Sequence, residues 1–297
     1  MGAKYRQTQK RIRGIQGNIK ITRAMELVAA SRIVKAQVRL VQARPYAMRI
    51  HQAIRELAGL TEVVHEFPLL REREKIETTG ILVITSDRGL AGAYNSNVIK
   101  VGVSMVREAQ RKGRRVRLHV VGKKGLAFFR FSNYEIASQM LGVTDTPRFE
   151  DAERLGEMLT TEFIDGTVDE VKIAYTDFRS AGSQVATQTQ ILPISSEEVE
   201  ATTGEIHPLF DFEPEPADIL SLLLPRYVNT VIFAALLESS ASEHAARRRA
   251  MKAATENGEE LVKVLTRIAN RERQAEITSE ILEVVGGAEA LRETATV

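Results

Sequence analysis

The chain has 297 residues, enough for one large or two ordinary domains, and its formal net charge is only +2 although the charges are unevenly spread. It contains no cysteine, which excludes a disulfide framework and a thiolate metal site. No uninterrupted apolar run reaches the ~18 residues that a membrane span needs, and the basic N-terminus has no apolar core. We therefore expect a soluble protein of the cytoplasmic type without a secretory signal.

The first 44 residues predict a long basic helix. They contain no proline, and Glu26 is their only acidic residue among many lysines and arginines. Apolar side chains follow helical spacing on two lines, one of which is Ile12, Ile15 and Ile19 and the other Leu27, Val34, Val38 and Val41. We expect a helix from about Lys4 to about Leu60, bent or loosened near Pro45. Its basic surface has three interpretations: a solvated face, a nucleic-acid site, or a face toward an acidic protein.

The middle of the chain predicts a small α/β sheet. Short apolar runs at Ile81–Ile84, Arg117–Val121 and Val171–Tyr175 read as buried strands, and Val185–Ile191 alternates as a half-exposed strand does. Helical patterns follow the first strand and precede the third. This alternation is typical of parallel strands joined by crossover helices.

The rest of the chain predicts an acidic loop and then a very long helix. Eight Asp and Glu residues lie between Glu197 and Asp218, with three prolines and no Lys or Arg. The following helix has an apolar or small line whose mean step is about 3.6 residues, which predicts a nearly straight helix about 100 Å long. That line comprises Val228, Val231, Ala235, Ser239, Ser242, Ala246, Ala250, Ala253, Asn257, Leu261, Val264 and Ile268. Such a helix needs a partner helix, and the N-terminal helix is the candidate.

Catalytic motifs are weak. The glycine turn Gly89–Tyr94 lies between a strand and a helix, where phosphates often bind, but it matches neither common phosphate-binding motif. The five histidines have no metal-ligand spacing, and no nucleophile elbow is present. We therefore expect neither a catalytic centre nor a cofactor or metal site. The residues alone favour an arm or shaft, with a nucleic-acid-binding coiled coil and an enzyme using the glycine turn as rivals.

Three blocks of sequence resemble the gamma subunit of F-type ATP synthases, in the bacterial form. They are Asn18–Arg32 (NIKITRAMELVAASR), Ser86–Asn95 (SDRGLAGAYN), and a C-terminal block that includes Leu236–Arg247 (LLESSASEHAAR), Met251–Asn257 and Arg273–Ala288. The resemblance implies a long antiparallel coiled coil of the terminal helices with an inserted, Rossmann-like α/β domain. The expected segments are a helix at 1–62, the α/β domain at 76–195, the acidic loop at 196–217 and the second helix at 218–297.

The same resemblance implies a function without catalysis on this chain. Gamma subunits form the rotating central stalk that couples ion-driven c-ring rotation to ATP synthesis on the beta subunits, and they regulate ATPase activity and proton flow. The implied partners are three alpha and three beta subunits, the epsilon subunit and the c-ring, with one copy of this chain per complex. No nucleic acid is implied, and the membrane is reached only through the c-ring, on the cytoplasmic side of the cell membrane.

The resemblance also implies contact residues. Arg273, Gln274 and Thr278 would meet the catch region of a beta subunit, and Met25 and Glu26 its acidic collar, with Arg247 nearby. The c-ring contact would be Phe210, Asp211 and Phe212, for which the alternative is a surface loop with two aromatic residues packed on the sheet.

Two residues depart from the family pattern. Ala91 stands where a cysteine is frequent, and Glu272 stands where a small apolar residue is common, adding a negative charge beside the expected beta contact. The chain also lacks the cysteine-bearing insertion of the chloroplast form, so we expect no thiol control of rotation.

Overall fold

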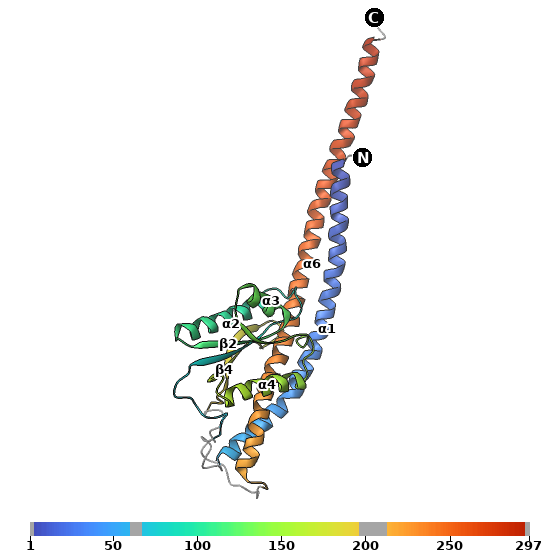
Figure 1. Ribbon diagram of the computed structural model, residues 1–297. Helices are drawn as coiled ribbons and strands as arrows, with labels where there is room; N and C mark the ends of the chain where they lie inside the picture. The colour runs from blue at the N-terminus through green and yellow to red at the C-terminus, as the bar shows by residue number, and fades with distance from the viewer. Residues whose placement is uncertain (1–2, 60–66, 196–212, 295–297) are drawn as a thin grey trace. The chain divides into compact units, whose positions relative to one another are not determined.

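A computed structural model describes residues 3–59, 67–195 and 213–294. The elements in chain order are α1 (Ala3–Gly59), β1 (Thr78–Ile84), α2 (Tyr94–Arg111), β2 (Arg115–Val121), α3 (Lys123–Phe131), β3 (Ile136–Met140), α4 (Phe149–Ile164), β4 (Glu170–Phe178), β5 (Gln184–Leu192) and α6 (Pro216–Thr294) (Figure 1). The chain divides into two compact units. We call Met1–Val28 with Arg248–Val297 the helical unit and Ala29–Arg247 the sheet unit.

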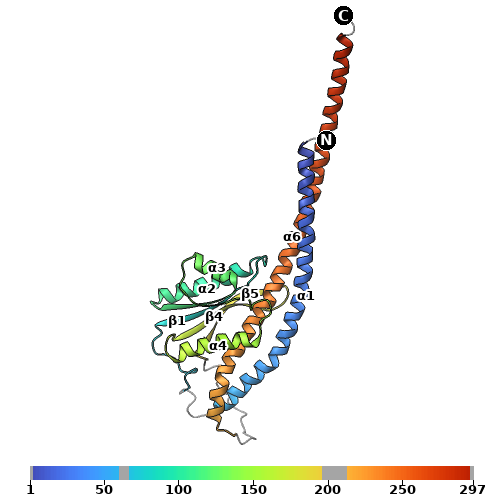
Figure 2. The ribbon, with the colours of Figure 1, turned by 45° about the vertical axis from the view of Figure 1, so that its right-hand side comes forward.

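The sheet unit is built on five strands in the order β3-β2-β1-β4-β5. All neighbouring pairs are parallel except β4 with β5. Helices α2 and α3 cover one face of the sheet and α4 covers the other (Figure 2). The predicted alternation of strands and helices is therefore confirmed, as is an inserted α/β domain between two long helices.

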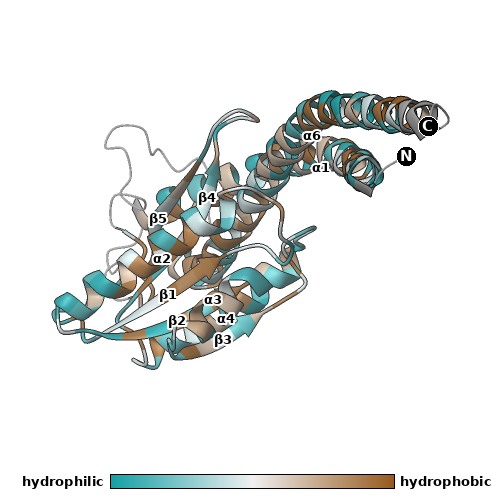
Figure 3. Cartoon of the chain, turned by 90° about the horizontal axis from the view of Figure 1, so that it is seen from above, coloured by the Kyte–Doolittle hydropathy of each residue, from teal (hydrophilic) through white to brown (hydrophobic). Residues whose placement is uncertain are grey.

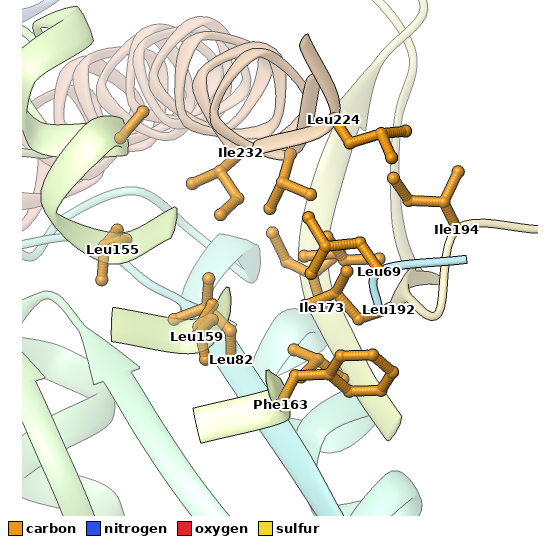
Figure 4. Close-up of a cluster of buried hydrophobic side chains, with 14 of the residues drawn as sticks. Leu69, Leu82, Leu155, Leu159, Phe163, Ile173, Leu192, Ile194, Leu224 and Ile232 are labelled. Atoms are coloured by element: carbon orange, nitrogen blue, oxygen red, sulfur yellow. The ribbon is translucent and has the colours of Figure 1, made fainter. Parts of the chain in front are cut away.

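Strand β1 has side chains buried on both faces because it lies in the middle of the sheet. Ile81 and Val83 pack in the core under α2 and α3, while Leu82 and Ile84 pack in the opposite core with α4 and α6. This is the pattern expected of a central parallel strand, and its apolar half stands out in Figure 3. Figure 4 shows the second core, in which Phe163 and Leu159 of α4 lie near Leu82 and Ile173.

The sequence did not predict α3 and β3. Strand β3 forms one edge of the sheet, and its residues are at most half-buried, so it lacks an apolar run. Helix α3 is only nine residues long and contains Gly125, which lies close to Thr85 of the neighbouring strand end. Both elements are too short and too weakly patterned for periodicity to identify.

Prolines lie inside both long helices. Helix α1 continues through Pro45 and α6 through Pro225, although each proline removes a backbone hydrogen bond. Helix α6 is also long and apolar enough to cross a membrane, by length and composition alone. Since Leu220, Val228 and Ile232 are fully buried in the core of the sheet unit, we assign this part of α6 to that core.

In the helical unit, α1 and α6 pair in opposite directions. The hydroxyl groups of Thr22 and Thr255 lie 2.7 Å apart, and Thr8 donates a hydrogen bond of 2.9 Å to Glu272. The earlier residue of α1, Thr8, thus contacts the later residue of α6, Glu272, which means that the two helices run in opposite directions. This confirms the predicted antiparallel coiled coil.

The expected contact line of α6 was wrong in the helical unit. Leu261, Val264 and Ile268 are 44%, 38% and 41% exposed. The contact instead uses Met251, Thr255, Gly258, Val262, Leu265 and Ala269, whose steps alternate between four and three residues and so form a heptad pattern. Small residues explain the choice, because a Cβ atom added at Gly258 would lie 2.8 Å from Ile19, so the two helices approach closely there.

The second apolar line of α1 is likewise on the outside. Leu27, Val34, Val38 and Val41 are all between 49% and 67% exposed. In the sheet unit, the buried line of α1 passes instead through Ala29, Ile33, Ala36 and Leu40, which also follow heptad spacing.

Candidate functional site

Within the sheet unit, residues from two of the three sequence blocks meet at the loop between β1 and α2, and Arg32 of the other block is linked to them through Asp145. Ser86 begins this loop, and its backbone N–H donates to the side chain of Asn95 at 2.9 Å, while the amide nitrogen of Asn95 donates back to the hydroxyl of Ser86 at 2.8 Å. The loop needs two left-handed residues, Leu90 with φ 62° and Gly92 with φ 56°. The reciprocal bonds fix its path.

Arg247 of α6 is bonded to this loop. Its guanidinium donates two hydrogen bonds to the carbonyl oxygen of Gly89, at 3.3 and 3.2 Å, and one to the carboxylate of Glu243 at 2.5 Å. Arg247 is only 7% exposed and Glu243 1%. Separating the two members of such a buried ion pair leaves a buried charge without a partner, which is strongly destabilising. The pair therefore favours this one arrangement of α6 and the loop.

Asp145 is a second junction of the same network. Its carboxylate binds the guanidinium of Arg32 from α1, and its backbone oxygen accepts a hydrogen bond of 3.3 Å from Ser240 of α6. His244 of α6 lies 3.7 Å from the carboxylate of Asp145 and 3.4 Å from Arg247. Helices α1 and α6 and the loop before α4 are thus tied together by charged side chains.

Burial sets the charge state of this network. It raises the pKa of Glu243 to about 7, against the opposing effect of Arg247. It lowers the pKa of His244 to about 4, with Asp145 acting in the opposite direction, so the imidazole is neutral at pH 7.

Asp87 gives the glycine turn a structural role. Its carboxylate accepts hydrogen bonds from the backbone N–H of Lys123 at 3.2 Å, in the first turn of α3, and from the hydroxyl of Thr144 at 3.0 Å. A helix N-terminus is the usual place for a phosphate, and here the chain's own carboxylate occupies it. The carbonyl oxygen of Gly89 in the same turn accepts a hydrogen bond from Arg247. This arrangement favours packing over nucleotide binding.

The predicted contact residues are divided between the two units. In the helical unit, Met25 and Glu26 are half-buried on α1, and Arg273, Gln274 and Thr278 are exposed on α6. The hydroxyl of Thr278 donates to the backbone oxygen of Gln274 at 2.9 Å. Arg247 belongs to the sheet unit and is buried, whereas Phe210, Asp211 and Phe212 lie outside the described residues.

Glu272 is accounted for by the coiled coil. Its carboxylate accepts the hydrogen bond of Thr8, so its charge faces α1 rather than standing free beside Gln274.

Sequence reasoning missed several buried polar residues. Glu243 and Arg247 stand four residues apart, which is a recognisable helical ion-pair spacing. No sequence pattern identified Asp145, because it lies in a loop that is far along the chain from its partners. Sequence reasoning also missed a third group, which is centred on His119. Its Nδ1 atom lies 2.8 Å from the hydroxyl of Ser138, and its Nε2 atom lies 3.2 Å from the carboxylate of Glu162. The guanidinium of Arg117 lies 2.9 Å from the same carboxylate.

Comparison with known proteins identifies the family. A family model described as ATP synthase matches residues 4–291. The ATP synthase gamma chain of Streptomyces avermitilis is 45% identical, with 98% of this chain and 97% of that protein aligned. The chain belongs to the ATP synthase gamma chain family. The gamma chain of Acidothermus cellulolyticus is 46% identical over 98% of each protein.

Solved structures agree with the membership in the gamma chain family. The central stalk and c-ring structure of the Tetrahymena thermophila mitochondrial ATP synthase contains a chain with 25% identity and a TM-score of 0.60, covering 79% of this chain and 99% of that one. A chain of the Euglena gracilis mitochondrial ATP synthase shares the fold with a TM-score of 0.71 at 19% identity, over 100% of this chain and 97% of that one. As a member of the gamma chain family, the protein is a non-catalytic subunit of the central stalk, and catalysis takes place on the beta subunits.

Proposed function

We propose that this chain rotates as the central stalk of an ATP synthase and couples ion-driven rotation of a c-ring to ATP synthesis on the beta subunits. One copy would stand within three alpha and three beta subunits, with the epsilon subunit and the c-ring as further partners. It would regulate ATPase activity and proton flow, and lie at the cytoplasmic side of the cell membrane, bound to the membrane through the c-ring alone.

The observation that carries this proposal is the apolar end of α6. Five large apolar residues of its last turns are 48–73% exposed, namely Ile277, Ile281, Leu282, Val284 and Val285. Large apolar side chains that are exposed close together along one helix are typical of a binding surface. Enclosure of this helix end by the alpha and beta subunits would remove that surface from water.

The basic surface of α1 supports the same proposal. Lys10, Arg13, Lys20 and Arg23 are all exposed on the helical unit. An acidic collar on the beta subunits is their natural counterpart. Single exposed ion pairs contribute about 1 kcal/mol or less, so such a surface allows three equivalent orientations without one deep minimum.

Among the proposed beta contacts, the exposed Arg273, Gln274 and Thr278 are the most accessible. Met25 and Glu26 contribute from α1. A direct contact of Arg247 with a beta subunit requires its bonds to Gly89 and Glu243 to open. We therefore give Arg247 a second proposed role, which is to hold α6 to the β1–α2 loop so that torque passes between the sheet and the helix.

Reconstitution tests the proposal. The full chain is mixed with cognate alpha and beta subunits, separated by gel filtration and assayed for ATP hydrolysis. We expect one copy of this chain per three alpha–beta pairs and multi-site hydrolysis that depends on it. Separate elution, with hydrolysis unaffected by the chain, would contradict the proposed function.

A matched pair of variants sharpens the assay. Ile281→Ser with Leu282→Ser removes apolar surface from the end of α6, and we expect weaker assembly and at least tenfold lower hydrolysis. Phe131→Ser is the control, since Phe131 is 89% exposed on α3 in the sheet unit. Equal effects of the two changes would argue against a role for the end of α6.

A further inference from the structure

Two cavities of the sheet unit adjoin the same carboxylate, that of Glu238 on α6. The larger has a volume of about 530 Å³ and lies between α1, α6 and strands β4 and β5. The smaller, of about 360 Å³, lies between α1, α6 and the start of α4. Ala47, Thr230 and Ala234 also line both, and the two alanines leave the space open. Together the cavities fall within the size range of small-molecule sites.

The walls of both cavities are largely aromatic and aliphatic. Phe149 and Phe233 form an edge-to-face pair with ring centres 5.5 Å apart beside the smaller cavity. His51 and Tyr227, with ring centres 6.0 Å apart, line the larger one together with Tyr175. Aromatic faces carry negative charge density, so such walls favour a cation over an anion.

Glu238 lacks a close cationic partner in the described part of the chain. It forms no ion pair within 4.0 Å there, and its carboxylate accepts a hydrogen bond from the backbone of Phe178. Arg44, which lines the smaller cavity together with Glu238, favours ionisation of this carboxylate less strongly than burial opposes it, and the negative charge of Asp177 also acts against its ionisation. Burial consequently raises the pKa of Glu238 to about 7. Because buried charges in proteins are usually paired, a half-buried carboxylate that lines an apolar cavity suits a ligand with its own positive charge.

We propose that these cavities bind a small apolar amine, whose ammonium group pairs with Glu238 and whose apolar body fills the larger cavity. Tyr175 and Tyr227 contact the apolar body. Because the site lies where α1 and α6 meet the sheet, an occupant would brace the two helices against β4 and β5. This function is separate from the proposed rotary one and needs no contact with a partner subunit.

Binding of paired probes to the full chain tests the assignment. Isothermal titration at pH 8, where Glu238 is mostly ionised, compares 4-phenylbutylamine with 4-phenylbutanol, which has a similar shape and no charge. We expect saturable binding of the amine, at least tenfold tighter than that of the alcohol, and a higher melting temperature with the amine alone. No binding of the amine, or equal affinity for the two probes, would overturn the proposal.

Variants locate the binding. Glu238→Gln keeps the shape of the side chain and should weaken amine binding at least tenfold, whereas Glu157→Gln, an exposed change on α4, should not. Ala234→Leu fills space in both cavities and should abolish binding of both probes. Circular dichroism confirms that each variant is folded. Undiminished amine binding in the folded Glu238→Gln and Ala234→Leu variants would show that the amine binds elsewhere.

Discussion

The two units bury their residues in different ways. In the sheet unit, β1 is enclosed on both faces, and charged residues such as Arg247 and Glu243 are buried and paired. In the described part of the helical unit, the buried apolar side chains include Ile12, Leu265 and Ala269 at the contact of α1 with α6, and residues 277–288 are all exposed. The sheet unit therefore has a core of its own, whereas the helical unit has a narrow seam, and we expect it to be stabilised when partners cover its outer surface.

Arg247→Met should give the largest effect, because it breaks the buried ion-pair network of the sheet unit. The carboxylate of Glu243 would remain buried without a cation, and we expect the free energy of unfolding to fall by about 3 kcal/mol. Urea denaturation of the full chain, followed by circular dichroism, measures this. Arg248→Met is the control on the exposed neighbouring residue. A double change of Arg247→Met with Glu243→Gln should recover part of the loss, and no recovery would mean that the pair is not the source of it.

Paired substitutions in α6 test the position of the seam in the helical unit. Ala269 is fully buried, so Ala269→Leu should overpack the contact and lower stability by about 1–3 kcal/mol. Ala253 is exposed, and Ala253→Leu should change stability by less than about 0.5 kcal/mol. Thermal melting of the reconstituted complex compares them. A larger loss of stability from Ala253→Leu than from Ala269→Leu would indicate that the line through Leu261 and Val264 forms the contact.

Glu238 should make the stability of the sheet unit depend on pH. Its pKa is raised from 4.5 in the unfolded chain to about 7, so the folded state holds the proton more tightly. The contribution to stability is complete below about pH 4.5 and is lost as the pH rises through about 7. Because the group is partly exposed, we expect a loss of about 1–2 kcal/mol relative to Glu238→Gln. Urea unfolding of both proteins at pH 4.5 and pH 8 measures the difference. Equal changes in the free energy of unfolding of the two proteins between these pH values would refute the raised pKa.

The surface ion pair of Arg23 with Glu259 should give the smallest effect. Its atoms are 3.5 Å apart, and the side chains are 65% and 46% exposed. We expect a coupling of less than about 1 kcal/mol, reduced further by salt. A double-mutant cycle with Arg23→Ala and Glu259→Ala measures it. A coupling as large as that of the buried Glu243–Arg247 pair would contradict the contrast between the units.

The sequence predicted the features that depend on strong, repeated patterns. The two long helices, their antiparallel pairing and the central strands were correctly expected. The phase of the seam was not, because α6 carries apolar residues on two lines and the larger ones, such as Leu261 and Ile268, suggested the wrong line. Contact requires close approach, and the small residues Thr255 and Gly258 provide it.

The candidate site was predicted only in part. The blocks around Gly89 and Arg247 were recognised separately, but periodicity could not show that these residues touch. Asp145 and Thr144 lie in a loop with no regular pattern, and their partners Arg32 and Asp87 are more than fifty residues away in the sequence. Such long-range polar pairs are set by the tertiary fold rather than by local preference.

Hydrogen–deuterium exchange of the full chain, alone and in the reconstituted complex, tests the central contrast most directly. The account predicts strong protection of β1, β2 and β4 in both states. It predicts protection of residues 3–28 and 248–294 that rises at least a hundredfold on assembly. Equal protection of both units in the free chain, with no change on assembly, would contradict it.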